Sequence, residues 1–248
     1  MQVVFHENFY QVYTSDPAAA AGRLEAIVDI IEPQVEFVRA RPAKEDQITL
    51  AHTQAHIDFV RESELYDISA LSAGAAIQAA EIGLKRPCFA VIRPPGHHAS
   101  SGSSWGFCYF NNMAIALQTL KQNQQIKTAY ILDIDLHYGD GTVNLLEGKD
   151  YVHVHNMEGQ DRHSYLSEIE KEMDHVQADL IGISAGFDNH RDDWGGLLTT
   201  DDYYTIGELV KKASSRCGGG CFGVLEGGYN HQVLGQNVLA LIQGLSSQ

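Results

Sequence analysis

The chain has 248 residues, of which 44% are hydrophobic and 20% are charged. This composition excludes a disordered or collagen-like protein, and no apolar run approaches the roughly 20 residues of a membrane span. The chain carries 17 Lys and Arg against 32 Asp and Glu, and its net charge of −15 argues against binding to nucleic acid or to an anionic membrane surface.

The length fits a single domain over residues 1–248, which can bury a large core without disulfides. The first residues, Met1–His6, lack the basic and apolar segments of a signal peptide. The cysteines form no Cys-x-x-Cys pair, and we expect free thiols in a reducing cytoplasm. They are Cys88, Cys108, Cys217 and Cys221.

Short apolar runs alternate with longer helical patterns along the chain. We predict strands at Gln2–Phe5, Phe89–Arg93, Ala129–Asp133, Tyr151–His155, Leu180–Ser184 and Cys221–Leu225. We predict helices at Ala18–Ile31, Gln54–Glu64, Ser69–Ile82, Asn111–Gln122, Tyr165–His175, Asp201–Cys217 (with Thr200 as N-cap) and Gln232–Leu245. Most of these strands are apolar throughout, which is typical of strands buried on both faces. The pattern predicts an α/β fold with a central, mainly parallel sheet flanked by helices on both faces.

Polar residues and glycines gather directly after four of the predicted strands. The carboxyl ends of parallel strands meet at one edge of a sheet, where α/β proteins bind their ligands. We therefore expect these segments to build one site. They are Pro94–His98, Ile134–Gly141, Ala185–Asp188 and Glu226–Asn230.

The segment after the strand Ala129–Asp133 has the spacing of a metal site. Side chains two apart on extended backbone point the same way, so Asp135 and His137 can reach one cation, with Asp133 behind them and Asp188 as a third ligand from the neighbouring strand. Two carboxylates and one imidazole leave a coordination position open, as in a catalytic zinc site. The alternative is a set of solvated acids and a surface histidine, which Asp-x-His alone would favour. The apolar strand and Asp188 argue against it, because buried charges need a counter-ion.

His97 and His98 follow a stiff Pro-Pro-Gly turn and can act as a general base and a general acid, tuned by Asp133 and Asp140. Tyr229 follows two glycines and can donate to a developing oxyanion. The alternatives are a surface loop with two histidines and a surface tyrosine in a turn.

Five motifs in order resemble those of the histone deacetylase superfamily, which includes acetylpolyamine amidohydrolases and acetoin-utilisation proteins. The resemblance is strong from about Phe89 onward and weaker over residues 1–84. Within the superfamily, the sequence is similar to the class II branch. The motifs are Arg93–Ala99, Gly106–Asn112, Asp133–Thr142, Ser184–Asp188 and Glu226–Asn230.

The resemblance implies the arginase/deacetylase fold and assigns roles to residues. It implies a Zn²⁺ ion bound by Asp135, His137 and Asp188. It implies an acid–base couple of His97 with Asp133 and His98 with Asp140, and a carbonyl-binding Tyr229. It places Phe107, Gly106 and Gly227 in the substrate site. It also implies a K⁺ ion near Asp133, Asp135, His137, His153 and Val154.

Some positions depart from the family pattern. The chain lacks the long loop that supplies an acidic residue to grip substrate, and Glu62, Glu64 or Asp67 are the candidates to replace it. The segment after His155 lacks the aromatic residue of the second channel wall, so Met157 is a candidate there and we expect a wider, shallower pocket. Trp105 and Trp194 are interpreted as packing or pocket-rim residues.

The resulting hypothesis is a cytoplasmic, zinc-dependent amidohydrolase that removes an acetyl or other short acyl group. The substrate is an acyl-lysine or a small acylated amine such as an acetylpolyamine, and the acidic charge mildly favours a cationic one. The alternatives are an arginase-like ureohydrolase with two manganese ions and a non-catalytic ligand sensor that retains the pocket. The sequence predicts no oligomeric state.

Overall fold

Seven parallel strands form one sheet in the order β2-β1-β3-β7-β6-β4-β5 in the computed structural model, which describes residues 1–247. Strands from both ends of the chain meet in it, because β3 pairs with β1 on one side and with β7 on the other. The strands are β1 (Gln2–Phe5), β2 (Glu36–Arg39), β3 (Cys88–Ala90), β4 (Ala129–Asp133), β5 (Val152–Asn156), β6 (Leu180–Ala185) and β7 (Gly220–Leu225).

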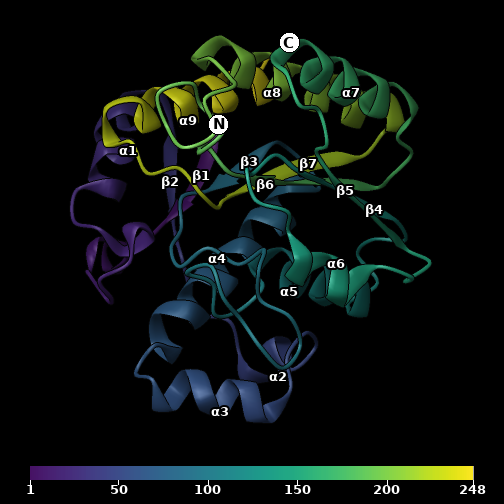
Figure 1. The fold of residues 1–248 in the computed structure, drawn as a ribbon. Helices are drawn as coiled ribbons and strands as arrows, with labels where there is room; N and C mark the ends of the chain where they lie inside the picture. The colour runs from purple at the N-terminus through teal and green to yellow at the C-terminus, as the bar shows by residue number, and fades with distance from the viewer. Residues whose placement is uncertain (248) are drawn as a thin grey trace.

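Helices cover both faces of the sheet, which confirms the predicted α/β architecture (Figure 1). One face carries α1 (Arg23–Ile31), α7 (Arg162–His175), α8 (Thr200–Cys217) and α9 (His231–Leu245). The other carries α4 (Tyr66–Gly83), α5 (Asn112–Gln122) and α6 (Asp140–Leu146), with the short α2 (Glu45–Ile48) and α3 (Gln54–Glu62) beyond them. The four central strands β3, β7, β6 and β4 are fully buried, as their continuous apolar runs predict.

Most predicted elements differ from the observed ones by a few residues at their ends, and three of these differences have a clear physical reason. The helix expected from Ala18 begins at Arg23, because Gly22 takes a left-handed conformation with φ +82° and ends the preceding turn. The strand expected to reach Arg93 ends at Ala90. Arg93 turns instead toward the N-terminal segment, where its buried guanidinium donates to the carbonyls of Ala20 and Gln11.

The first residue of α8 is Thr200, and its N-cap is Thr199 rather than the expected Thr200. The Asp202 carboxylate accepts hydrogen bonds from the Thr199 N–H and hydroxyl, at 2.7 and 2.9 Å. The strand β2 and the helices α2 and α6 were not predicted, since each is short and β2 is a partly exposed edge strand. The four cysteines are free thiols, as expected. Over residues 1–247, the helices include none that is both long and apolar enough to cross a membrane.

Candidate active site

The four polar segments meet at the carboxyl edge of the sheet, because β3, β7, β6 and β4 are consecutive strands. The carbonyl of Ser184 accepts the Ile134 N–H, and the carbonyl of Gly227 accepts the Phe187 N–H, so the loops remain paired beyond the strand ends. The predicted common site is therefore present as a set of neighbouring loops.

Asp135, His137 and Asp188 lie close together, as the spacing predicts. Their ligand atoms all lie within 4.8 Å of one another. His137 Nδ1 is 3.2 Å from Asp135 Oδ1 and 3.1 Å from Asp188 Oδ2. Both carboxylates are buried, whereas 38% of the His137 side chain is exposed, so the group opens toward solvent only on the imidazole side.

The contacts of the two carboxylates fit a bound cation. Asp135 Oδ2 accepts the Gly227 N–H at 2.8 Å, and Asp188 Oδ1 accepts the Leu136 N–H at 3.1 Å. Asp188 Oδ2 is buried and receives no backbone N–H; its polar contact is the ion pair with His137 Nδ1 at 3.1 Å. A buried carboxylate oxygen with so few donors is costly, and a metal ion would satisfy it. Gly227 is required beside these groups, since a Cβ there would lie 2.6 Å from Asp135 Oδ2 and 2.7 Å from Asp188 Oδ2.

The electrostatics of the group also favour a positive charge at its centre. Burial and the neighbouring charge of Asp135 raise the pKa of Asp188 to about 6. Hydrogen bonds to Asp135 and Asp188 raise the pKa of His137 to about 10. Two buried carboxylates thus draw a proton onto the adjacent imidazole, and a divalent cation bound to all three would replace that proton.

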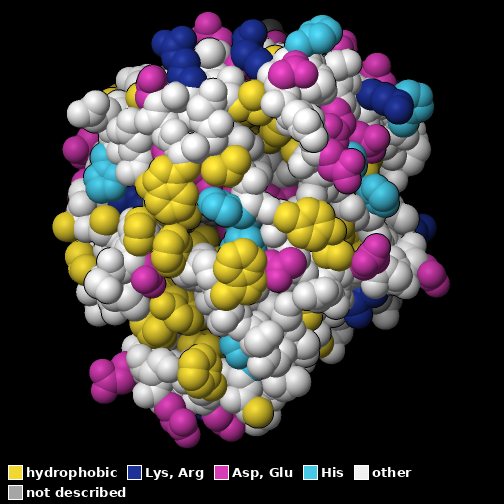
Figure 2. Space-filling view, viewed as in Figure 1, with side chains coloured by type: hydrophobic (Ala, Val, Ile, Leu, Met, Phe, Trp, Pro, Cys, Tyr) yellow, Lys and Arg dark blue, Asp and Glu magenta, His cyan; other side chains and the backbone are white. Residues whose placement is uncertain are grey.

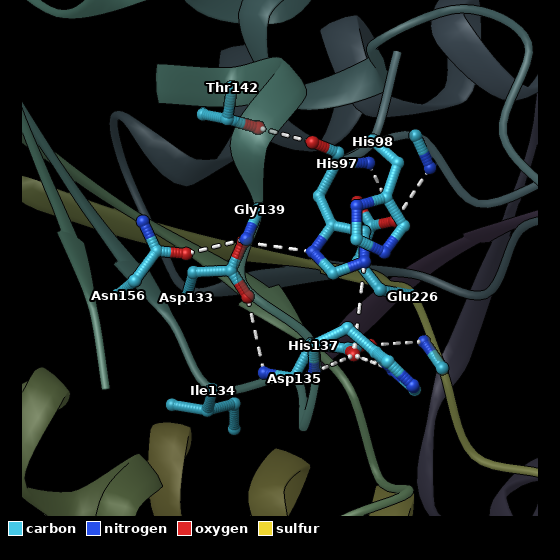
Figure 3. Close-up of polar contacts among 12 residues, drawn as sticks. His97, His98, Asp133, Ile134, Asp135, His137, Gly139, Thr142, Asn156 and Glu226 are labelled. Carbon is cyan, nitrogen blue, oxygen red and sulfur yellow. Dashed lines mark hydrogen bonds and ion pairs between the residues drawn. The ribbon is translucent and has the colours of Figure 1, made fainter. Parts of the chain in front are cut away.

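His97 and His98 lie beside this group with their rings 4.0 Å apart (Figure 3). His97 Nδ1 is 3.1 Å from Asp133 Oδ2, and His98 Nδ1 is 2.7 Å from Asp140 Oδ1. Each imidazole therefore has its own carboxylate, in the pairing that the resemblance implies. His97 Nε2 lies 3.8 Å from Asp135 Oδ1, which places the metal-ligand candidates and the histidine pair in direct contact.

The two imidazoles differ in basicity. Burial alone would lower the pKa of His97, but the charges of Asp135 and Asp133 outweigh it and raise the pKa well above its usual value. Burial and the adjacent charge of His97 lower the pKa of His98 to about 4. Only one of the two imidazoles therefore carries the additional proton that makes it positively charged, because a charge on either ring disfavours a charge on the other.

Glu226 connects two of the loops, a role that the sequence analysis did not identify. The side chain is buried, and its Oε2 accepts the backbone N–H groups of Gly96 and His97 at 2.6 and 3.2 Å. Burial raises the pKa of Glu226 to about 7. The position of an acid directly after β7 was the signal that could have indicated it, since a buried acid at a strand end needs donors from a neighbouring loop.

A cavity of about 260 Å³ opens above the metal-ligand candidates. Figure 2 shows histidine side chains beside large hydrophobic ones near the middle of the face seen in Figure 1. The wall includes Gly106, Phe107 and Gly227, which the resemblance places in the substrate site. The full lining is Pro95, His97, His98, Trp105, Gly106, Phe107, His137, Trp194, Gly227 and Tyr229.

Two tryptophans form walls of this cavity, which bears out their interpretation as pocket-rim residues. The Trp105 ring lies over His98, with centroids 3.8 Å apart, and its Nε1–H donates to Asp140 at 2.9 Å. Trp194 lies on the other side, beside His137 and Tyr229. The suggestion that Met157 lines the cavity is wrong, because Met157 packs against the hydrophobic core. We expected no aromatic wall after His155, and an aromatic wall comes instead from Trp194, on the loop after β6.

The residues considered for gripping substrate, Glu62, Glu64 and Asp67, are also absent from the lining of the cavity. Glu62 is the last residue of α3, Glu64 follows that helix, and Asp67 lies in the first turn of α4. None of the three contributes to the cavity wall.

The loop that carries Tyr229 is held from two sides, by residues that the sequence analysis did not select. Asp193 Oδ2 accepts the N–H groups of Tyr229 and Asn230 at 2.8 and 2.7 Å. The buried guanidinium of Arg23 donates to the carbonyl of Gly228 at 2.8 Å and to that of Glu226 at 2.7 Å. These contacts join segments that are far apart in the chain, so no local sequence pattern predicts them.

The residues named for potassium do not share one surface. The Asp133 carboxylate accepts the Asp135 N–H and faces His97. The His153 side chain instead lies in a separate group with His155 and Glu172. The potassium site stays a prediction.

Comparison with known proteins identifies the family of this chain. The model of the histone deacetylase domain matches residues 18–166 and 151–245. A probable deacetylase of Methanothermobacter thermautotrophicus is 27% identical, over 99% of this chain and 91% of that protein. The polyamine deacetylase HDAC10 of Danio rerio is 26% identical over 92% of this chain, which spans 40% of that protein. The crystal structure of the HDA15 HD domain superposes with a TM-score of 0.84 at 23% identity, over 98% of this chain and 88% of that one, and shares the fold.

Proposed function

The chain belongs to the histone deacetylase family and is a hydrolytic deacetylase, and we propose that it uses Zn²⁺ to remove an acetyl or short acyl group from an acyl-lysine or a small acylated amine. The observation that carries the proposal is the convergence of Asp135, His137 and Asp188 beside a histidine pair, at the base of an aromatic cavity. Family membership supports the reaction class.

Asp135, His137 and Asp188 would hold the metal. Two carboxylates and one imidazole suit zinc and leave a position open for a reactant. When bound there, zinc supplies the positive charge that polarises an amide carbonyl and acidifies a water molecule. Asp188 Oδ2, which is buried and contacts only the imidazole that would itself bind the ion, is the oxygen that most requires it.

His97 and His98 would move the protons of the hydrolysis. Since the pair carries one proton beyond its neutral form, one ring can deliver that proton to the departing amine while the other accepts the proton of the attacking water, and the pair ends with the charge it began with. Asp133 and Asp140 hold the rings by their Nδ1 atoms, so that each Nε2 remains available for proton transfer.

Tyr229 would donate its hydroxyl hydrogen bond to the oxyanion that develops on the amide carbonyl. Its ring lies in the cavity wall against Trp194 and Phe107. Burial raises the pKa of its hydroxyl far above the usual value, so the group stays protonated and remains a donor. A fixed donor in a partly buried site stabilises a developing charge with little reorganisation.

The cavity supports a substrate with an apolar stem. Its walls include four aromatic side chains, Trp105, Phe107, Trp194 and Tyr229, which suit an aliphatic chain and attract a cation over their faces. The net charge of −15 also favours a cationic amine. We therefore propose acyl-lysine and acetylated polyamines as substrate classes, the latter in line with the relative from Danio rerio.

The test measures release of acetate from a fluorogenic acetyl-lysine and from acetylated polyamines, with and without a chelator. We expect turnover of at least one class, loss of turnover after chelation, and recovery with Zn²⁺. A zinc-loaded protein that hydrolyses neither class would overturn the proposal and favour a ligand sensor.

A further inference from the structure

A second group of metal-binding side chains lies away from the cavity, between β5 and α7. His153 and His155 come from β5, the edge strand of the sheet, and Glu172 comes from α7. One ligand atom of each lies within 4.8 Å of the others. The two histidines are two residues apart on a strand, so both point to one face of the sheet. This is the face of Tyr130 and Leu132, their partners on β4, and α7 covers it.

His155 is held as metal-binding histidines usually are. Its Nε2 lies 2.8 Å from Glu168 Oε1, which accepts the ring N–H. Its Nδ1 is then free to bind a cation and faces Glu172 Oε2 at 3.9 Å. A carboxylate on the second ring nitrogen fixes the tautomer and raises the basicity of the first. Glu168 and Glu172 are four residues apart on α7, so one face of the helix presents both.

Glu172 is also fixed by a second contact. Its Oε2 accepts the Tyr130 hydroxyl at 2.9 Å. The Tyr130 ring contacts both histidine rings, with centroids 5.2 Å from His153 and 6.5 Å from His155. One tyrosine therefore orders the carboxylate and packs against both imidazoles. Only His153 is exposed, and it can close over an ion that the other two groups hold.

We propose that His153, His155 and Glu172 form a second site, for a divalent transition-metal ion such as Zn²⁺, Ni²⁺ or Cu²⁺. Two imidazoles and one carboxylate favour these ions over Mg²⁺ and Ca²⁺, which prefer oxygen ligands. Three ligands at a partly exposed position leave further coordination to water. The site is independent of the cavity and does not depend on the proposed reaction.

The test counts zinc ions per chain after equilibrium dialysis of the full-length protein against Zn²⁺. Compared with the wild type, His153→Ala and Glu172→Gln should each lose one equivalent. The controls His163→Ala and Glu170→Gln change exposed residues of α7, the helix that carries Glu172. They should keep the wild-type count of zinc ions. Equal zinc counts in the wild type, His153→Ala and Glu172→Gln would overturn the proposal. An equal loss of zinc in the two controls would also overturn it, because it would indicate adventitious binding.

The active-site ligand is tested in parallel, so that the two proposals fail separately. Asp188→Asn should lose a different equivalent, and its combination with His153→Ala should lose two. If Asp188→Asn keeps the full count, the active-site assignment fails, while the loss in His153→Ala still supports the second site.

Discussion

The rings of Trp194 and Tyr229 are stacked, with their centroids 4.0 Å apart and their planes 24° apart. The preceding residue, Asp193, accepts the N–H groups of Tyr229 and Asn230. One loop therefore orients both the ring and the backbone of Tyr229, although Trp194 itself is 53% exposed. The position of the proposed oxyanion donor depends on the loop after β6 and not only on its own segment.

Removal of this support should slow turnover without removing the metal. In Asp193→Ala two backbone N–H groups lose their acceptor, and we expect kcat to fall about tenfold or more, since 1.4 kcal/mol corresponds to a factor of ten. Steady-state kinetics and metal analysis of the same preparation provide the check. The neighbouring Asp192→Ala, whose exposed carboxylate contacts neither Tyr229 nor Asn230, is the control. Equal kcat values in the two variants would contradict the role of Asp193.

Tyr229→Phe should be more severe. It keeps the ring against Trp194 and removes only the hydroxyl, so we expect kcat to fall about 10²–10³-fold, which is the usual cost of losing one oxyanion donor. Zinc content and unfolding temperature should match those of the wild type. A variant with normal turnover would exclude Tyr229 from the reaction.

Asp188→Asn should lose the active-site metal. The change neutralises a buried carboxylate of the group, and it weakens any cation site formed with Asp135 and His137. We expect the variant to have low activity that added Zn²⁺ does not restore. The wild type, by contrast, should recover its activity when Zn²⁺ is added after chelation. Asp174→Asn, an exposed position on α7, is the matched control. Full activity in Asp188→Asn would contradict the proposed ligand set.

Trp105→Phe should change the pH dependence of the reaction. Phenylalanine can keep a ring over His98 but cannot donate to Asp140, which then attracts a proton on His98 more strongly. We expect the limb of the kcat/KM profile that reports the histidine pair to move to higher pH. The profile of Trp194→Phe, which leaves Asp140 untouched, should keep the wild-type position. Superimposable profiles for Trp105→Phe and wild type would rule out this coupling.

His52 should make the fold sensitive to acid. It is buried, its Nδ1 lies 2.9 Å from the Ser100 carbonyl, and its Nε2 accepts the Asn111 N–H at 2.9 Å. Burial and the nearby His56 lower its pKa to about 4. Below pH about 6.5 His52 becomes protonated in the unfolded chain but stays neutral in the folded chain. Acid therefore favours the unfolded state, and the free energy of unfolding falls by about 2 kcal/mol between pH 7.5 and 5.

Urea unfolding at the two pH values checks this effect. His52→Gln removes the titrating group, so its free energy of unfolding should depend less on pH by that amount. His163→Gln, at an exposed position, should show the wild-type dependence. An unchanged dependence in His52→Gln would contradict the assignment.

The fold class and the location of the site were predictable, because both follow from short-range patterns. Continuous apolar runs indicated buried parallel strands, and the polar segments after them marked the edge where the loops meet. Contacts between distant segments were predictable where strand ends or the family motifs bring side chains together, as for His97 with Asp133, but not elsewhere. Asp193 and Tyr229 are 36 residues apart, and Arg23 reaches Gly228 across 205 residues. Hydrogen bonds of this kind have no periodicity, so the roles of Glu226 and Asp193 emerged only from the structure.

The order of the strands has a consequence for synthesis on the ribosome. β7, the last strand to emerge, lies between β3 and β6 and joins β2-β1-β3 to β6-β4-β5. A nascent chain that stops before Gly220 therefore exposes the apolar edges of two incomplete half-sheets, each prone to pairing with other chains. The complete sheet can therefore form only after nearly the whole polypeptide has been synthesised. Until β7 emerges, we expect the two half-sheets to need protection by chaperones that bind nascent chains.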